Sequence, residues 1–110
     1  MSDLPDTKEI VVFITAPSED EAARIARALV ESRLAACVNI VKNIRSIYSW
    51  QGNIEDDSEV LMLAKTRMDL FHELSNKTKE LHSYDVPEII ALPIIDGAED
   101  YIKWLNDSTG

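Results

Sequence analysis

Apolar residues recur with two different periods along this 110-residue chain, and these periods predict strands and helices in alternation. Residues 10–14 form a continuous apolar run rich in β-branched side chains, which predicts a strand covered on both faces. Ser18 and Glu21 then have the spacing of a capping box at the start of a helix. Apolar positions every three or four residues continue this helix, which we expect over residues 19–33.

A long β-hairpin is predicted next. Its parts are a second strand in two pieces, a turn and a third strand, at residues 37–41, 46–50, 51–53 and 54–66. Tyr48 and Trp50 lie two residues apart and therefore on one face of the second strand. Because most strands have about five or six residues, arms of this length need a further surface to pack against.

The remainder of the chain predicts a helix, a strand and a short final helix. Thr66 and Asp69 resemble a second capping box, and the helix that they introduce is expected over residues 68–82. A strand over residues 88–94 and a helix over residues 98–105 complete the chain. This element order is that of a ferredoxin-like α+β sandwich, with the first and third strands central and the helices on one face of the sheet.

The third strand is apolar on both of its faces. Two sets of side chains alternate along it: Val60, Met62 and Ala64 on one face, and Leu61, Leu63 and Lys65 on the other. This is more apolar surface than one layer of helices can bury, so the pattern predicts a partner subunit. Tyr48 and Trp50 fit either a subunit interface or the ordinary position of a half-buried aromatic side chain. Trp104 fits either the same interface or a place over the core.

Composition and charge narrow the possible functions. With 45% hydrophobic and 28% charged residues, the chain is expected to form one domain, residues 1–110, structured over about 9–107. A formal charge of −9 argues against a nucleic-acid partner, because such binding needs clustered Lys and Arg. No apolar run reaches the roughly 18 residues of a membrane span and no signal peptide is visible, so we expect no membrane partner and a cytoplasmic location.

Enzyme signatures are absent from the sequence. The only glycines are Gly52, Gly97 and Gly110, so no glycine-rich loop can hold a phosphate group. Neither an HExxH pattern nor a Ser, His and Asp grouping typical of hydrolases occurs. We therefore expect that the protein is not an enzyme.

Few side chains could bind a soft or borderline metal ion. Such ions prefer thiolate and imidazole, which only Cys37, His72 and His82 can supply. Helical geometry predicts that His72 faces solvent. His82 ends the second long helix just before Tyr84, where it fits either a metal ligand or a histidine that stabilises the helix C-terminus. Cys37 lies in an apolar segment and fits either a small core residue or a ligand thiol.

Polar side chains suggest two further sites. Four acidic residues follow the hairpin turn: Glu55, Asp56, Asp57 and Glu59. This acidic strip fits either a set of ligands for a hard cation or a solvated hairpin edge protected against pairing. Four more polar residues stand near strand ends: Lys65, Tyr84, Asp85 and Glu88. They fit either a ligand cleft or a structural ion pair between Lys65 and Glu88.

Four separated motifs carry a resemblance to a known family. They are ESRLAACVNIV, SIYSWQGNIE, LAKT and HSYDVPEI, which begin at Glu31, Ser46, Leu63 and His82. In this order and spacing they resemble the CutA family of divalent-cation tolerance proteins, over residues 9–105. The resemblance implies a role in the response to divalent metal ions.

The same resemblance implies a homotrimer with an architecture like that of PII signalling proteins. In such a trimer the long hairpin extends the sheet of a neighbouring subunit and brings Trp50 to a cleft with Lys65, Tyr84 and Glu88. A PII-like signalling trimer that binds an unidentified small ligand in this cleft is the alternative function. A purely structural or partner-docking trimer is the third.

Family members with a described copper site imply where its ligands would lie. One position is the end of the first strand, and the other two directly precede the tyrosine motif. Here these positions are Ile14, Leu81 and His82, so one of the three implied ligands is present. We therefore expect weak binding of copper(II) or another divalent metal, with His82 as its ligand.

Overall fold

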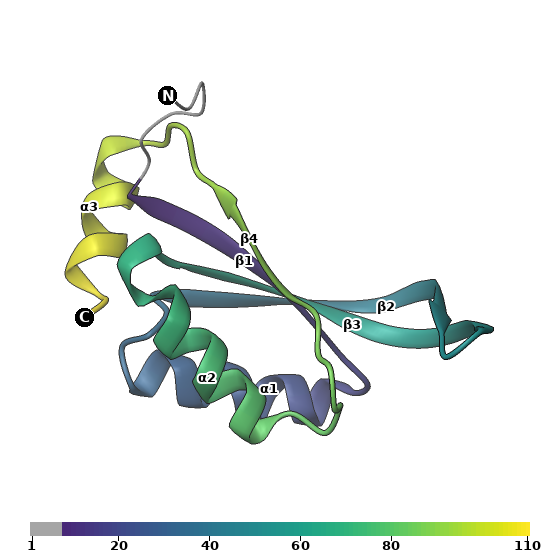
Figure 1. The fold of residues 1–110 in the computed structure, drawn as a ribbon. Helices are drawn as coiled ribbons and strands as arrows, with labels where there is room; N and C mark the ends of the chain where they lie inside the picture. Colours follow the sequence, from purple (N-terminus) through teal and green to yellow (C-terminus); the bar gives the residue numbers. More distant parts are fainter. Residues whose placement is uncertain (1–7) are drawn as a thin grey trace.

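A four-stranded antiparallel sheet forms the centre of the computed structural model, which describes residues 8–110 (Figure 1). Its strands are β1 (Glu9–Ala16), β2 (Cys37–Trp50), β3 (Asn53–Arg67) and β4 (Ile89–Pro93). They lie in the order β2-β3-β1-β4, so the predicted central position of the first and third strands is confirmed.

Two helices, α1 (Glu19–Glu31) and α2 (Phe71–Leu81), cover one face of this sheet, and the short helix η1 (Met68–Leu70) leads into α2 (Figure 1). The last helix, α3 (Glu99–Asp107), lies at one end of the sheet. This arrangement confirms the ferredoxin-like α+β sandwich. Within residues 8–110, no helix combines the length and the apolar character that crossing a membrane requires.

The hydrophobic core lies between the sheet and helices α1 and α2. Ile10, Val12 and Ile14 of β1 point into it and are at most 1% exposed. The alternate residues of β1, Val11 and Phe13, point to the other face and are only half-buried. The expectation that residues 10–14 are covered on both faces is therefore wrong for a single chain, because its two long helices lie on the same side.

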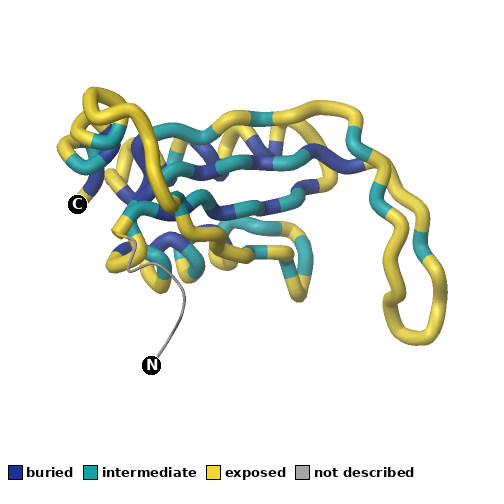
Figure 2. Tube along the Cα trace, turned by 90° about the horizontal axis from the view of Figure 1, so that it is seen from above, coloured by how far each residue is buried: buried dark blue, intermediate teal, exposed yellow. Residues whose placement is uncertain are grey.

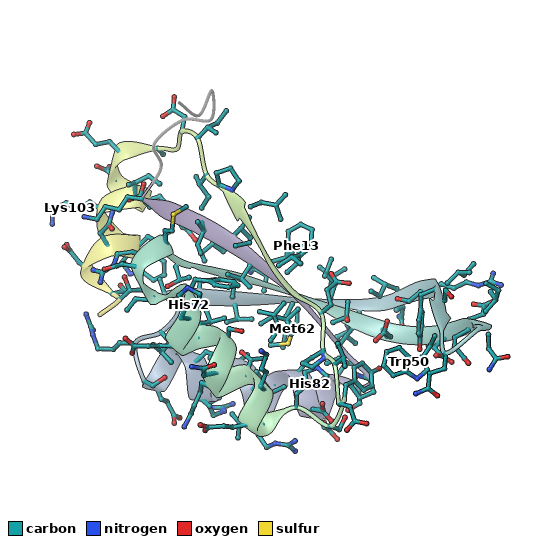
Figure 3. The ribbon with its side chains drawn as sticks, viewed as in Figure 1. Phe13, Trp50, Met62, His72, His82 and Lys103 are labelled. Carbon is teal, nitrogen blue, oxygen red and sulfur yellow. The ribbon has the colours of Figure 1, made fainter. Side chains whose placement is uncertain are left out.

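The second face of the sheet is left open in the described chain. Strand pairing places six apolar side chains on it: Val11, Phe13, Leu61, Leu63, Ile90 and Leu92. Figure 3 shows Phe13 on this side of the sheet and Met62 on the side of the helices. We call this surface the open sheet face. Ile90 is 52% exposed, so apolar side chains on this face contact solvent. Exposed apolar area of this kind is typical of surfaces that bind another protein chain.

The β2–β3 hairpin extends well beyond the sheet. β1 pairs with β3 only from Val60 to Arg67, so residues 53–59 pair with β2 alone. The resulting two-stranded hairpin arm, residues 44–59, projects from the body with an exposed tip (Figures 1 and 2). Gln51 and Gly52 have φ angles of 50° and 83°, as a two-residue turn requires. Because an isolated two-stranded ribbon is marginally stable in water, this arm calls for a partner.

The two predicted capping boxes have different outcomes. Ser18 does cap α1, since its hydroxyl accepts the backbone N–H of Glu21 at 3.2 Å. Thr66 does not cap α2, because it lies inside β3, is fully buried, and donates its hydroxyl to the Leu34 carbonyl at 2.7 Å. The second capping prediction is therefore wrong, and η1 leads into α2 without a side-chain cap.

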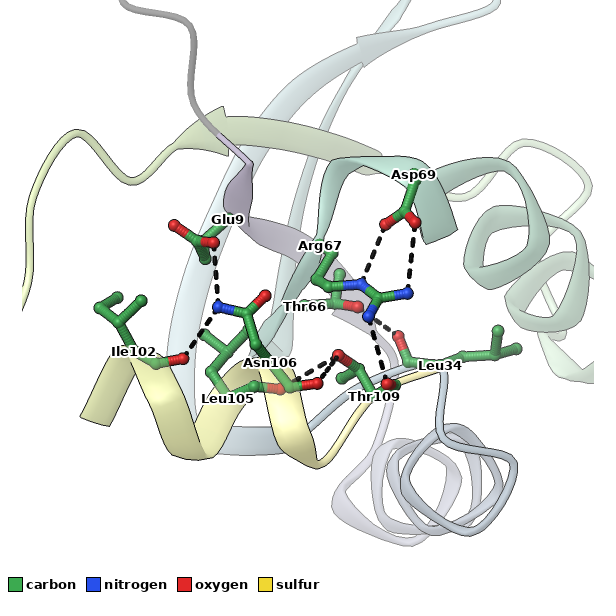
Figure 4. A network of polar contacts seen from close by, with 9 residues as sticks. All are labelled: Glu9, Leu34, Thr66, Arg67, Asp69, Ile102, Leu105, Asn106 and Thr109. Carbon is green, nitrogen blue, oxygen red and sulfur yellow. Dashed lines mark hydrogen bonds and ion pairs between the residues drawn. The ribbon is translucent and has the colours of Figure 1, made fainter. Parts of the chain in front are cut away.

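Polar contacts attach α3 to the end of the sheet (Figure 4). Asn106 donates its side-chain N–H to the Glu9 carboxylate at 3.1 Å, and Arg67 donates to the Thr109 carbonyl at 3.4 Å. Leu105 is the fully buried residue of this helix, whereas Trp104 stays 45% exposed. Trp104 was expected either at a subunit interface or over the core. In this chain Leu105 occupies the core position.

Candidate functional site

A cavity of about 750 Å³ lies between the hairpin arm and the loop that joins α2 to β4. Its aromatic lining comes from both elements: Tyr48 and Trp50 from the arm, and Tyr84 from the loop. Figure 3 shows Trp50 on the arm, on the side of the loop that follows His82. Three carboxylates also line the cavity: Glu59 comes from the arm, and Asp85 and Glu88 come from the loop.

Glu59 connects the two walls of this cavity. It is only 7% exposed, and its carboxylate accepts the Tyr84 hydroxyl at 2.8 Å. Burial of the phenol, together with this hydrogen bond, raises the pKa of Tyr84 well above its ordinary range. Tyr84 therefore remains a neutral hydrogen-bond donor to Glu59 at physiological pH.

The acidic strip of the arm is only partly a solvated edge, because two of its carboxylates contact side chains of β2. Asp56 forms a two-pronged ion pair with Arg45, at 2.9 and 2.6 Å. Asp57 accepts the Tyr48 hydroxyl at 2.6 Å, and this bond, with burial and the charges of Asp57, Glu59 and Glu55, raises the pKa of Tyr48 to about 12. Each of these contacts orients an arm residue beside the cavity.

The α2–β4 loop is anchored by a residue of α1. Glu21 is 9% exposed, and one of its carboxylate oxygens accepts both the backbone N–H and the hydroxyl of Ser83, each at 3.0 Å. Burial acts to raise the pKa of Glu21, but the two hydrogen bonds from Ser83 and the nearby His82 and Arg24 outweigh it, so the pKa is lowered. The anchor thus needs the ionised carboxylate.

This anchor predicts a pH-dependent part of the stability. Because the folded-state pKa of Glu21 lies below the ordinary 4.5, its contribution is present above that value and is lost as the pH falls through the lowered pKa. We expect the free energy of unfolding to fall more steeply between about pH 5 and pH 3 in the wild type than in Glu21→Gln. Urea denaturation at several pH values measures this difference. Equal slopes for the two proteins would show that Glu21 does not anchor the loop.

His82 was predicted to end this helix and directly follows α2, and its side chain is fully buried, with 0% exposed. Its Nε2 lies 2.7 Å from the Thr15 carbonyl oxygen, which can only accept, so Nε2 carries the hydrogen. Its Nδ1 accepts the backbone N–H of Tyr84 at 3.1 Å. Both ring nitrogens therefore hold the loop against β1.

The residues implied for a soft-metal site do not fit such an ion in the described structure. A histidine ligand must offer a free ring nitrogen, and both nitrogens of His82 are engaged. Ile14, which stands at another implied ligand position, is fully buried in the core. Residues 8–110 contain no group of three or more His, Cys, Asp or Glu side chains placed to hold a metal ion.

The cavity brings together three of the four residues predicted for one cleft. Trp50, Tyr84 and Glu88 line it, whereas Lys65 does not. Lys65 lies six residues beyond Glu59 in β3, a distance of about 20 Å along an extended strand. Lys65 therefore lies outside the cavity of its own subunit. Only the Lys65 of a second subunit could reach this cavity.

Lys65 and Cys37 are instead neighbours on the open sheet face. They are directly paired across β2 and β3, and the Lys65 ammonium donates to the side-chain oxygen of Asn39. Cys37 is half-buried there and belongs to neither the helix-covered core nor the cavity. His72 is exposed on α2, as expected.

Three supporting residues could not be identified as such from the sequence. Glu21 fitted a helix start, Ser83 belonged to a family motif without a role of its own, and Arg45 stood between two predicted strand pieces. Glu59 did carry a usable signal. It continues the two-residue period of Leu61 and Leu63, so it belongs to a half-buried row and not to a solvated edge.

Comparisons with known proteins match almost the whole chain. The family model for the CutA1 divalent ion tolerance protein matches residues 10–108. The divalent-cation tolerance protein CutA of Thermus thermophilus is 55% identical over 102 residues, which are 93% of this chain and 99% of that protein. The solved T. thermophilus structure superimposes with a TM-score of 0.91 over the same shares of the two chains.

A more distant solved structure shows the same fold. The periplasmic divalent cation tolerance protein CutA of Archaeoglobus fulgidus is 43% identical, with 91% of this chain and 97% of that chain covered and a TM-score of 0.88. The predicted resemblance is thus confirmed on sequence and on structure. The chain belongs to the CutA1 family of divalent ion tolerance proteins.

Proposed function

We propose that this protein serves divalent-cation tolerance as a homotrimer whose hairpin arms join neighbouring subunits. Two features support this assembly: the apolar open sheet face, and an arm that carries Ile47 and Ile54 at 63% and 76% exposed. Subunit association removes such apolar area from water, and this is the dominant favourable term in most protein association. Several residues of the arm would then lie in a cleft between subunits.

Within this trimer, cation binding is weak and relies on carboxylates. The observation that carries this proposal is the cavity with Glu59, Asp85 and Glu88 in its lining, none of which forms an ion pair within residues 8–110. Carboxylate oxygens suit hard divalent cations. Copper(II) at His82, as the sequence suggested, would require the ring to give up its bond to Thr15 or Tyr84.

Calorimetric titration tests this cation binding. We expect copper(II) and magnesium to bind with dissociation constants weaker than about 0.1 mM, because no closed ligand shell is formed. Glu88→Gln should weaken both further, and Glu80→Gln, which removes the same charge from an exposed position of α2, should not. A tight stoichiometric copper site that is lost in Cys37→Ser would contradict this account and assign copper to the open sheet face.

The second candidate is a signalling trimer that binds a small ligand in the cleft. The three aromatic side chains of the cavity favour it, since a metal ion alone makes no use of them. Lys65 of a neighbouring subunit stays part of this proposal. In both cases the protein has no catalytic role and works in the cytoplasm, which cell fractionation with an antibody against the chain would test.

A further inference from the structure

The charge of the cavity is not neutralised by the described chain. Of the charged residues in its lining, three are acidic and one, Arg45, is basic. The Arg45 guanidinium already makes both of its close contacts with Asp56, at 2.9 and 2.6 Å. With Lys65 of a neighbouring subunit in the cleft, as proposed above, three carboxylates would still face one ammonium group. The field of Glu59, Asp85 and Glu88 therefore favours a cationic ligand.

Glu59 strengthens this argument because it is buried. A carboxylate that is only 7% exposed has lost most of its hydration, and its one hydrogen bond within residues 8–110 comes from the neutral Tyr84 hydroxyl. Burying a charge without an opposite charge is unfavourable. A cationic group in the cavity would supply the missing charge at the position where it is most needed.

The walls of the cavity indicate what kind of cation fits. Tyr48 and Trp50 are 40% and 43% exposed, so their rings are accessible from the cavity, and Tyr84 completes an aromatic lining. Aromatic rings attract organic ammonium groups through their negative faces, and they also pack against attached methylene groups. A hydrated metal ion gains neither contact.

The size of the cavity agrees with an organic ligand. A volume of about 750 Å³ lies within the range of small-molecule sites and exceeds the needs of one metal ion. We propose that this cavity binds a small organic cation with more than one ammonium group, held by Glu59, Asp85 and Glu88 and packed against Trp50. This inference rests on the small-ligand form of the proposed function and names the chemical class of its ligand.

Three probes of matched size or charge separate the alternatives in calorimetric titrations of the dialysed full chain. Putrescine carries two ammonium groups on a four-carbon chain, 1,4-butanediol has the same carbon chain without charge, and magnesium has the charge without the carbon chain. We expect binding of putrescine that is at least about tenfold tighter than that of either control.

Two pairs of variants locate the site. Trp50→Leu removes the ring and Glu88→Gln removes a charge, and each should weaken putrescine binding by about tenfold. Trp104→Leu and Glu80→Gln are the matched controls, from α3 and from the exposed side of α2, and should bind like the wild type. Light scattering on each variant verifies that the assembly is unchanged.

The relative binding of putrescine and magnesium distinguishes an organic-cation site from cation binding by the carboxylates alone. Preferential putrescine binding that depends on Trp50 and Glu88 supports the inference. Magnesium binding equal to that of putrescine, unchanged in Trp50→Leu, would overturn the inference and leave cation binding by carboxylates intact. If none of the three probes binds the wild type, both the inference and the cavity's role in cation binding are wrong.

Discussion

His82→Ala is expected to lower the free energy of unfolding by about 3 kcal/mol. The substitution removes a fully buried ring and leaves the Thr15 carbonyl and the Tyr84 N–H without their partners. The cavity left by the ring and the unpaired polar groups each contribute, because loss of a buried aromatic ring typically costs several kcal/mol. Chemical denaturation of the two proteins at equal concentration measures the difference.

His72→Ala is the matched control for this substitution. His72 lies exposed on α2, so its removal should change the free energy of unfolding by less than about 0.5 kcal/mol. The structural role of His82 would be refuted by a His82→Ala protein that is as stable as the wild type and has lost its copper binding. That result would return His82 to the position of a metal ligand.

Ile54→Asp is expected to have the largest effect on assembly. Ile54 is 76% exposed in the single chain, so an aspartate there leaves the subunit fold intact. In the proposed trimer, the same side chain would bring an unpaired charge into an interface, at a cost of about 2 kcal/mol or more in association. Size-exclusion chromatography over a range of concentrations should show dissociation at concentrations where the wild type remains assembled.

Val30→Asp separates this effect from a general loss of surface hydrophobicity. Val30 is 43% exposed on α1, away from the hairpin arm and from the open sheet face. It should assemble like the wild type. Dissociation of both variants, or of neither, would show that the arm does not make the interface.

Much of the fold follows from local patterns in the sequence. The period of the apolar residues in β1 and α1 is sufficient to predict both elements, and Ser18 marks the start of α1 as expected. Thr66 misled because its spacing to Asp69 is that of a capping box, while its real partner is the distant Leu34 carbonyl. A local pattern does not report contacts of this range.

The cavity shows the same limit more clearly. Tyr84 and Glu88 were predicted to share a cleft because each stands near the end of an element, and the family resemblance implied that a neighbouring subunit's Trp50 would join them. In the structure Trp50 of the same chain lines the cavity. The two-residue period of β3 places Glu59 in a half-buried row, but its contact with Tyr84 depends on the return of the α2–β4 loop to the hairpin arm. No local pattern of the chain reveals that contact. Lys65 was grouped with them by its place near a strand end, but it lies six residues beyond Glu59 in β3 and does not line the cavity of one chain. Its place in a cleft between subunits stays a prediction.

The mass of the assembled protein tests the central proposal most directly, since both the intersubunit cleft and the role of the hairpin arm depend on it. Light scattering coupled to size exclusion, combined with native mass spectrometry of protein purified without added metal, gives this mass. The account predicts three times the mass of one chain. A mass equal to a single chain would contradict it, because the open sheet face and the exposed arm would then have no partner.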